Sequence, residues 1–106
     1  MPKMLIKASY TADGARGLLK VGGTGRRAAV QKLIEGIGGK IEAFYFAYGD
    51  ADAYLIVDVP EATDGLALSI AVNASGAVTL STTPLITAEE MDKACKKGVA
   101  YRAPGA

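Results

Sequence analysis

The chain contains no histidine and no tryptophan, and it has a single cysteine, Cys95. Without histidine, general acid–base chemistry near pH 7 needs a Lys, Asp or Glu with a strongly shifted pKa, which makes a catalytic role harder to build. One cysteine forms no internal disulfide, and such a chain is typical of a reducing compartment. Lys96 and Lys97 could acidify the Cys95 thiol, but we interpret Cys95 as a small packing residue.

Excess charge and long apolar segments are missing as well. The chain has 12 basic and 11 acidic residues, a net charge of +1, which gives no electrostatic basis for nucleic-acid binding. No apolar run approaches the ~20 residues that span a bilayer, and the run near the N-terminus is too short for a signal peptide. We therefore expect a cytoplasmic protein with neither a membrane nor a nucleic-acid partner.

What the sequence does contain fits one globular α+β domain. Half of the 106 residues are apolar, enough for one ordinary core. Thr11 is a helix N-cap candidate, Gly22 and Gly23 break the helix that follows, and Thr87 with Glu90 forms a capping box. Hydrophobic periodicity then predicts the elements in between. The predicted strands are 4–10, 40–48, 53–59 and 77–83, with Pro84 ending the last, and the predicted helices are 12–21, 24–37, 61–74 and 87–97.

The order of these elements is β-α-β-β-α-β, with the first helix split in two and one helix appended. This order fits the split β-α-β topology. Strand 53–59 then lies between strands 4–10 and 40–48, strand 77–83 lies beside strand 4–10, and right-handed crossovers place both main helices on one face of the sheet. Helix 61–74 is apolar on most of its circumference, which predicts that it is buried on most sides.

The hairpin of residues 40–59 is apolar on both faces. One face of the hairpin packs against the helices of its own domain. The other face must therefore be covered by something else. Either the set containing Ala43 and Tyr45 or the set containing Phe44 and Phe46 must point outward. An apolar surface of this size is near the limit that soluble monomers tolerate. We expect a homo-oligomer, with the alternative that helix 87–97 folds back over the face.

Four stretches carry a resemblance to a known family. They are MLIKASYTADGARGLLKVGG, RRAAVQKLIEGIGGKIE, FYFAYGDADAYLIVDVP and NASGAVTLSTTPLITAEEM. Together they cover residue 3 to about residue 97, and the chain resembles the GYD-domain family of small bacterial and archaeal proteins. The family signature falls on the hairpin turn Gly49, Asp50 and Asp52, with Ala51 in place of its tyrosine. The resemblance implies a ferredoxin-like domain and a dimeric α/β-barrel-like assembly, with no established activity. We expect this domain to cover residues 1–98, followed by a tail over residues 99–106, and we expect no cofactor.

Two glycine-containing segments are candidate ligand sites. Asp50 and Asp52 could hold Mg²⁺ or Ca²⁺, but Gly and Asp are also what tight turns use, and we interpret the segment as a turn without a metal. The stretch from Gly22 to Arg27 could bind an anion at a helix N-terminus. It has no phosphate-loop pattern, and we interpret it as a break between helices with solvated arginines.

The polar half of the exposed sheet face is a third candidate. If two sheets pack face to face, its side chains line a cleft in the interface, where Tyr54 and Asp58 could be neighbours. The candidate ligand-binding residues are Lys7, Ser9, Thr79, Ser81 and Thr83. We favour a homo-oligomeric domain that binds a small ligand in this cleft. The alternative is a cofactor-independent enzyme acting on a small, partly apolar substrate, with Lys7, Tyr54 and Asp58 as its catalytic residues.

Overall fold

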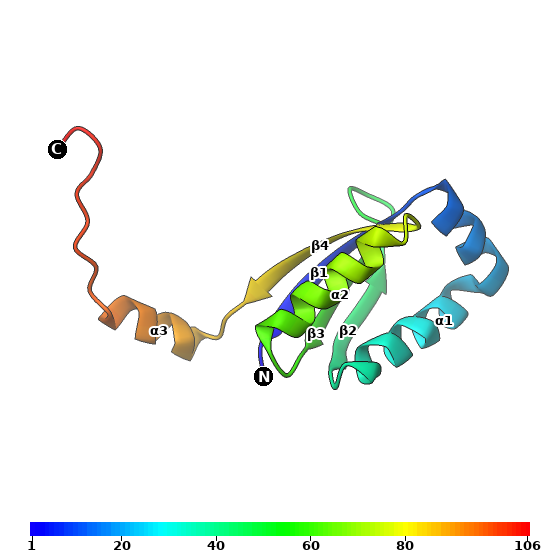
Figure 1. The fold of residues 1–106 in the computed structure, drawn as a ribbon, viewed down its shortest axis with the longest axis horizontal. Helices are drawn as coiled ribbons and strands as arrows, with labels where there is room; N and C mark the ends of the chain where they lie inside the picture. The colour runs from blue at the N-terminus through cyan, green and yellow to red at the C-terminus, as the bar shows by residue number, and fades with distance from the viewer.

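The computed structural model describes residues 1–106 and has the predicted α+β composition. Four strands and three helices follow one another in the order β-α-β-β-α-β-α, which is compatible with a ferredoxin-like fold (Figure 1). The strands are β1 (Lys3–Tyr10), β2 (Lys40–Phe46), β3 (Ala53–Asp58) and β4 (Val78–Leu85), and the helices are α1 (Ala12–Gly36), α2 (Ala62–Ala74) and α3 (Ala88–Lys96).

The strands form one antiparallel sheet in the order β2-β3-β1-β4, as predicted. Alternate side chains of β1 are buried, namely Met4, Ile6 and Ala8. They meet Leu55 and Val57 of β3 in a core that α1 and α2 cover from one side. The prediction that both helices lie on the same face of the sheet is therefore confirmed.

The first helix begins and bends where the sequence indicated. The Thr11 hydroxyl accepts a hydrogen bond from the Gly14 backbone N–H, which caps the helix N-terminus. Gly22 has φ 72° and ψ 175°, a backbone conformation that residues other than glycine rarely adopt. The predicted break is thus a kink within α1, and the helix axis changes direction at this residue.

The hairpin differs from its prediction. β2 ends at Phe46, so residues 47–52 form a loop rather than a tight turn at the end of two longer strands. The pairing of β2 with β3 shifts between Ile41 and Ala43, which makes Glu42 an extra residue in a β-bulge. Because of this bulge, neither of the two strictly alternating sets points outward: Phe44 contacts the core, and Ala43 lies on the opposite face.

Two further expectations are corrected. β4 continues through Pro84 to Leu85. The strand is at the edge of the sheet, where the missing N–H of proline costs no ladder hydrogen bond. Helix α2 is not buried on most sides, since Leu66 and Ile70 are 60% and 61% exposed.

The C-terminal arm, residues 86–106, extends away from the rest of the molecule. The Thr87–Glu90 capping box is present and starts α3 as predicted. Figure 1 shows that α3 and the tail lie beyond one end of the sheet. The radius of gyration, 16.9 Å, exceeds the roughly 13 Å of a compact domain of this length. The alternative in which helix 87–97 covers the sheet is therefore wrong for the single chain.

None of the helices is long and apolar enough to cross a membrane.

Candidate functional site

The side of the sheet that faces away from α1 and α2 is uncovered, and we call it the open face. The strand register places every second residue there, so that the polar candidates from β1 and β4 lie together: Lys7 is opposite Ser81, and Ser9 is opposite Thr79. The open face consists of Lys3, Leu5, Lys7, Ser9, Lys40, Glu42, Ala43, Tyr45, Tyr54, Ile56, Asp58, Thr79, Ser81, Thr83 and Leu85.

Lys7 lies near the middle of the open face, between Tyr54 of β3 and Ser81 of β4. Its Nζ atom is 6.0 Å from the centroid of the Tyr54 ring, a cation–π distance. Lys7 forms no ion pair within the chain. The arrangement therefore presents an ammonium group beside a ring and hydroxyl groups.

Asp58, the third candidate catalytic residue, has a different partner. Lys3 Nζ donates to Asp58 Oδ1 at 2.9 Å and to Glu42 Oε2 at 2.6 Å. The hydrogen bonds to Glu42 and then to Asp58 are the main causes that raise the pKa of Lys3 above 10.5. Asp58 is only 7% exposed, so Lys3 neutralises a nearly buried carboxylate. The structure thus brings Lys7 to Tyr54 and separates both from Asp58.

Sequence reasoning did not find this charge cluster. Lys3 has the same strand phase as Lys7, which is a usable signal that both lie on one face. Glu42 joins the cluster at the position of the β-bulge, and nothing local in the sequence indicates a bulge there. Only the pairing of distant strands places the three charges together.

The other part of the open face is apolar. Leu5 of β1 and Ile56 of β3 are direct cross-strand neighbours, and Ala43 of β2 continues the row. Tyr45, next along β2 on this side, is 73% exposed. No element of the same chain covers these side chains, because both large helices lie on the other face and α3 projects away (Figure 1).

The hairpin loop has a structural role in the single chain. The Asp52 carboxylate accepts a hydrogen bond from the Tyr10 N–H at 2.8 Å, and the Asp52 N–H donates to the Ala8 carbonyl at 2.8 Å. These bonds attach the loop to the end of β1. Ala51, at the signature tyrosine position, is 3% exposed, whereas Gly49 and Asp50 are exposed. The structure groups no three His, Cys, Asp or Glu side chains that could hold a metal ion.

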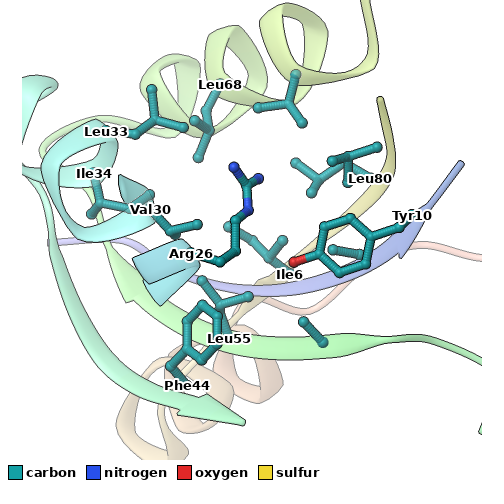
Figure 2. A pocket seen from close by; sticks show the side chains of 14 residues that line it. Ile6, Tyr10, Arg26, Val30, Leu33, Ile34, Phe44, Leu55, Leu68 and Leu80 are labelled. Atoms are coloured by element: carbon teal, nitrogen blue, oxygen red, sulfur yellow. The ribbon is translucent and has the colours of Figure 1, made fainter. Parts of the chain in front are cut away.

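The remaining candidates lie on helices. Arg27 is exposed and its guanidinium lies 5.8 Å from the Phe44 ring centroid. Arg26 turns instead toward the helix side of the sheet, over the Tyr10 ring, and is half-buried (Figure 2). The prediction that both arginines are solvated is therefore wrong for Arg26. Cys95 is exposed on α3, so it is not a packing residue within this chain.

Comparison with known proteins gives a family and no individual relative. No curated protein and no solved structure shows significant similarity to the chain. The family model described as "GYD domain" matches residues 4–95, which is most of the sequence. The chain belongs to the GYD-domain family, whose function is unknown.

Proposed function

We propose that this protein is a self-associating domain in which the open faces of two copies form the interface, and that the polar half of each face lines a cleft for a small ligand. One observation carries the proposal. The apolar row formed by Leu5, Ala43 and Ile56 is only half-buried by its neighbours in the sheet, and no helix packs over it, because α3 projects away. A second copy of the chain can cover this row, because it is present wherever the protein itself is present.

The size of the open face supports an interface of this kind. Four strands at ~4.8 Å spacing and about eight residues at ~3.3 Å rise give roughly 500 Å² in flat projection. Side-chain relief raises the accessible area toward the ~800 Å² that each partner buries in a standard protein interface. Face-to-face packing of two sheets about 10 Å apart is an established way to bury such surfaces.

The charges on the face are compatible with burial. Lys3 pairs with both Glu42 and Asp58, so each of these three charges has a partner within the chain, and the cluster keeps one negative charge in excess. Lys7 has no such partner. In an interface its ammonium group would need an acceptor, and the neighbouring hydroxyls of Ser9 and Ser81 complete a polar cleft. A small ligand carrying a negative charge has the matching chemistry.

The C-terminal arm supports self-association independently. Along residues 86–106 the exposed side chains include Ile86, Met91, Val99 and Tyr101, with exposed fractions from 51% to 84%. α3 also concentrates its apolar residues on one side. An amphipathic helix without a partner in its own chain is typical of segments that pack on another molecule.

The experiment that tests the assembly inserts a charge into the apolar row. Ile56→Lys should leave the far-UV circular dichroism spectrum unchanged and convert a dimer or larger species into a monomer, measured by light scattering after size-exclusion chromatography. Leu66→Lys is the matched control, because Leu66 is exposed on α2 and away from the open face. Dissociation by Leu66→Lys alone would move the interface to the helices and contradict the proposal.

The ligand cleft is tested separately with Lys7→Met, which removes the ammonium group and keeps the apolar stem. We expect millimolar inorganic phosphate to raise the melting temperature of the wild type, and we expect this variant to assemble like the wild type without that increase. An equal increase in the melting temperature of both proteins would show that phosphate binds elsewhere, and it would contradict the proposed ligand cleft.

A catalytic function has weaker support than assembly. Lys7 and Tyr54 are neighbours, as a lysine base and a hydroxyl donor would need to be. Asp58, however, is held by Lys3, and Lys7 faces Ser81 on its other side. The geometry therefore supports a binding role for Lys7 more directly than a role in proton transfer.

A further inference from the structure

A second candidate site lies on the opposite side of the sheet, between α1, α2 and the core. It is a pocket lined by 14 residues, of which 13 are hydrophobic and the exception is Arg26. The free volume of the pocket is about 40 Å³. One water molecule needs roughly 10–15 Å³ on this measure, so the space takes a small group rather than a large ligand. Figure 2 shows the Arg26 side chain extending into this space, toward the side where Leu68 of α2 lies.

The guanidinium of Arg26 has no anionic partner in the chain. No Asp or Glu lines the pocket, and Arg26 takes part in none of the ion pairs. Its Nε atom is out of reach of solvent and donates no hydrogen bond. The Tyr10 ring, with its centroid 5.8 Å from the Arg26 Cζ atom, is the one charge-stabilising contact that the structure gives it. A half-buried guanidinium with an unpartnered Nε–H and no carboxylate beside it favours the binding of an anion.

The helix phase explains why Arg26 points inward. Val30 and Ile34 follow it at intervals of four residues, and both pack into the core. Residues at this spacing share one face of a helix, so Arg26 occupies a position that the pattern would otherwise fill with an apolar side chain. Arg27, one position later, is exposed and donates to Gln31 at 3.3 Å. The kink at Gly22 separates this part of α1 from its first turns.

We propose that this pocket binds a short-chain aliphatic monocarboxylate. The carboxylate pairs with the guanidinium of Arg26, whose planar fork of N–H donors matches its two oxygens. The aliphatic chain lies against Val30 and Leu33 of α1 and against Leu68 and Val72 of α2, which line the pocket. The site forms within one chain and on the other face of the sheet from the proposed interface, so the inference is independent of the assembly.

The lining selects this ligand class over other anions. A peptide carboxyl terminus would bring amide groups that find no hydrogen-bond partner among hydrophobic side chains. Phosphate carries more charge and more acceptor atoms than one guanidinium satisfies, and it has no apolar part for the remaining lining. A monocarboxylate with a few methyl or methylene groups satisfies the single cation and fills the apolar space.

The test is a titration followed by NMR on protein with labelled Val and Leu methyl groups. Isovalerate and propionate are the probes, with isoamyl alcohol and isoamylamine as matched compounds without the carboxylate. We expect saturable shifts of the methyl signals of Val30, Leu33, Leu68 and Val72 with the acids. The alcohol should bind at least about tenfold more weakly, the equivalent of one charge-assisted hydrogen bond, and the amine should not bind.

Arg26→Met tests the anchor, and Arg27→Met is the matched control on the exposed side of the same helix. We expect Arg26→Met to abolish the response to isovalerate and to unfold at an equal or higher temperature without ligand, because it replaces an unpaired, half-buried cation with an apolar chain. Arg27→Met should bind like the wild type. Arg26→Lys keeps the charge without the fork, and we expect it to bind more weakly than the wild type.

Three results would overturn the proposal. One is the absence of saturable methyl shifts in the wild type with either acid. The second is undiminished isovalerate binding by Arg26→Met. The third is a lowered melting temperature of Arg26→Met together with shifts that map to other residues, which would make Arg26 a structural residue that stacks on Tyr10.

Discussion

Lys7 and Tyr54 face each other across β1 and β3, with the lysine Nζ atom 6.0 Å from the centre of the tyrosine ring. This pair lies on the open face, between the polar residues of β4 and the apolar row formed by Leu5, Ala43 and Ile56. It places an ammonium group without an anionic partner at the boundary between the two halves of the face. The proposed self-association depends on whether a second copy of the chain covers this part of the open face.

The Lys3 ion pairs predict a specific pH dependence of stability. The pKa of Lys3 is raised in the folded protein by Glu42 and Asp58. A raised pKa gives stability that is fully present below the unfolded value of 10.5 and is lost as the pH rises through the higher folded value. Lys3→Met should therefore be less stable than the wild type at neutral pH, and the difference should shrink above pH 10.5.

Urea unfolding of the wild type and Lys3→Met across this range measures the difference. Lys20→Met is the control, because Lys20 is exposed and forms no ion pair. A stability difference between wild type and Lys3→Met that stayed constant with pH would show that the ion pairs do not contribute as described.

Phe44 and Phe46 should differ in their contribution to the fold. Their rings meet edge to face with centroids 5.1 Å apart. Phe44 packs against the core, whereas Phe46 is 42% exposed. We expect Phe44→Ser to lower the free energy of unfolding by about 3 kcal/mol and Phe46→Ser by about 1 kcal/mol. Equal losses in urea unfolding would mean that β2 is placed in the wrong register.

Two glycines of α1 give a matched pair of substitutions. A Cβ atom at Gly14 would overlap the backbone carbonyl oxygen of Ala77, whereas a Cβ atom at Gly17 meets nothing. We expect Gly14→Ala to destabilise the fold by roughly 2 kcal/mol or more through steric strain. Gly17→Ala should stabilise it by about 0.5–1 kcal/mol, because alanine favours the helix. Thermal unfolding distinguishes the two, and similar effects would contradict the contact between α1 and the start of β4.

Asn73 attaches α2 to the edge strand. Its side-chain oxygen accepts a hydrogen bond from the Leu80 N–H at 2.7 Å, and its amide nitrogen donates to the Leu80 carbonyl at 3.2 Å. Asn73→Ala should cost about 1–2 kcal/mol and speed hydrogen exchange at the Leu80 amide. Ser69→Ala, one turn earlier on the same polar stripe, should cost less than about 0.5 kcal/mol. Unchanged exchange at Leu80 in Asn73→Ala would rule out this attachment.

The parts of the fold that depend on local chemistry could be predicted from the sequence. Thr11 caps a helix, Gly22 bends it and Thr87 with Glu90 starts the last helix, because each acts on backbone groups within a few residues. Strand order followed from the element sequence and the handedness of crossovers. These features need no knowledge of distant residues.

The features that were missed depend on tertiary contacts. The bulge at Glu42 accompanies an ion pair with Lys3, which is 39 residues away. The projection of α3 depends on the absence of contacts with the body, which no periodicity encodes. Arg26 is an intermediate case: its spacing to Val30 and Ile34 is a signal for an inward position, which the interpretation of both arginines as solvated did not use.

Sedimentation equilibrium of the wild-type chain at micromolar concentration tests the central claim most directly. The account predicts a mass of at least twice the 10.9 kDa of one chain. A mass of 10.9 kDa across that concentration range would contradict it, because the apolar row of the open face would then be stable in contact with water.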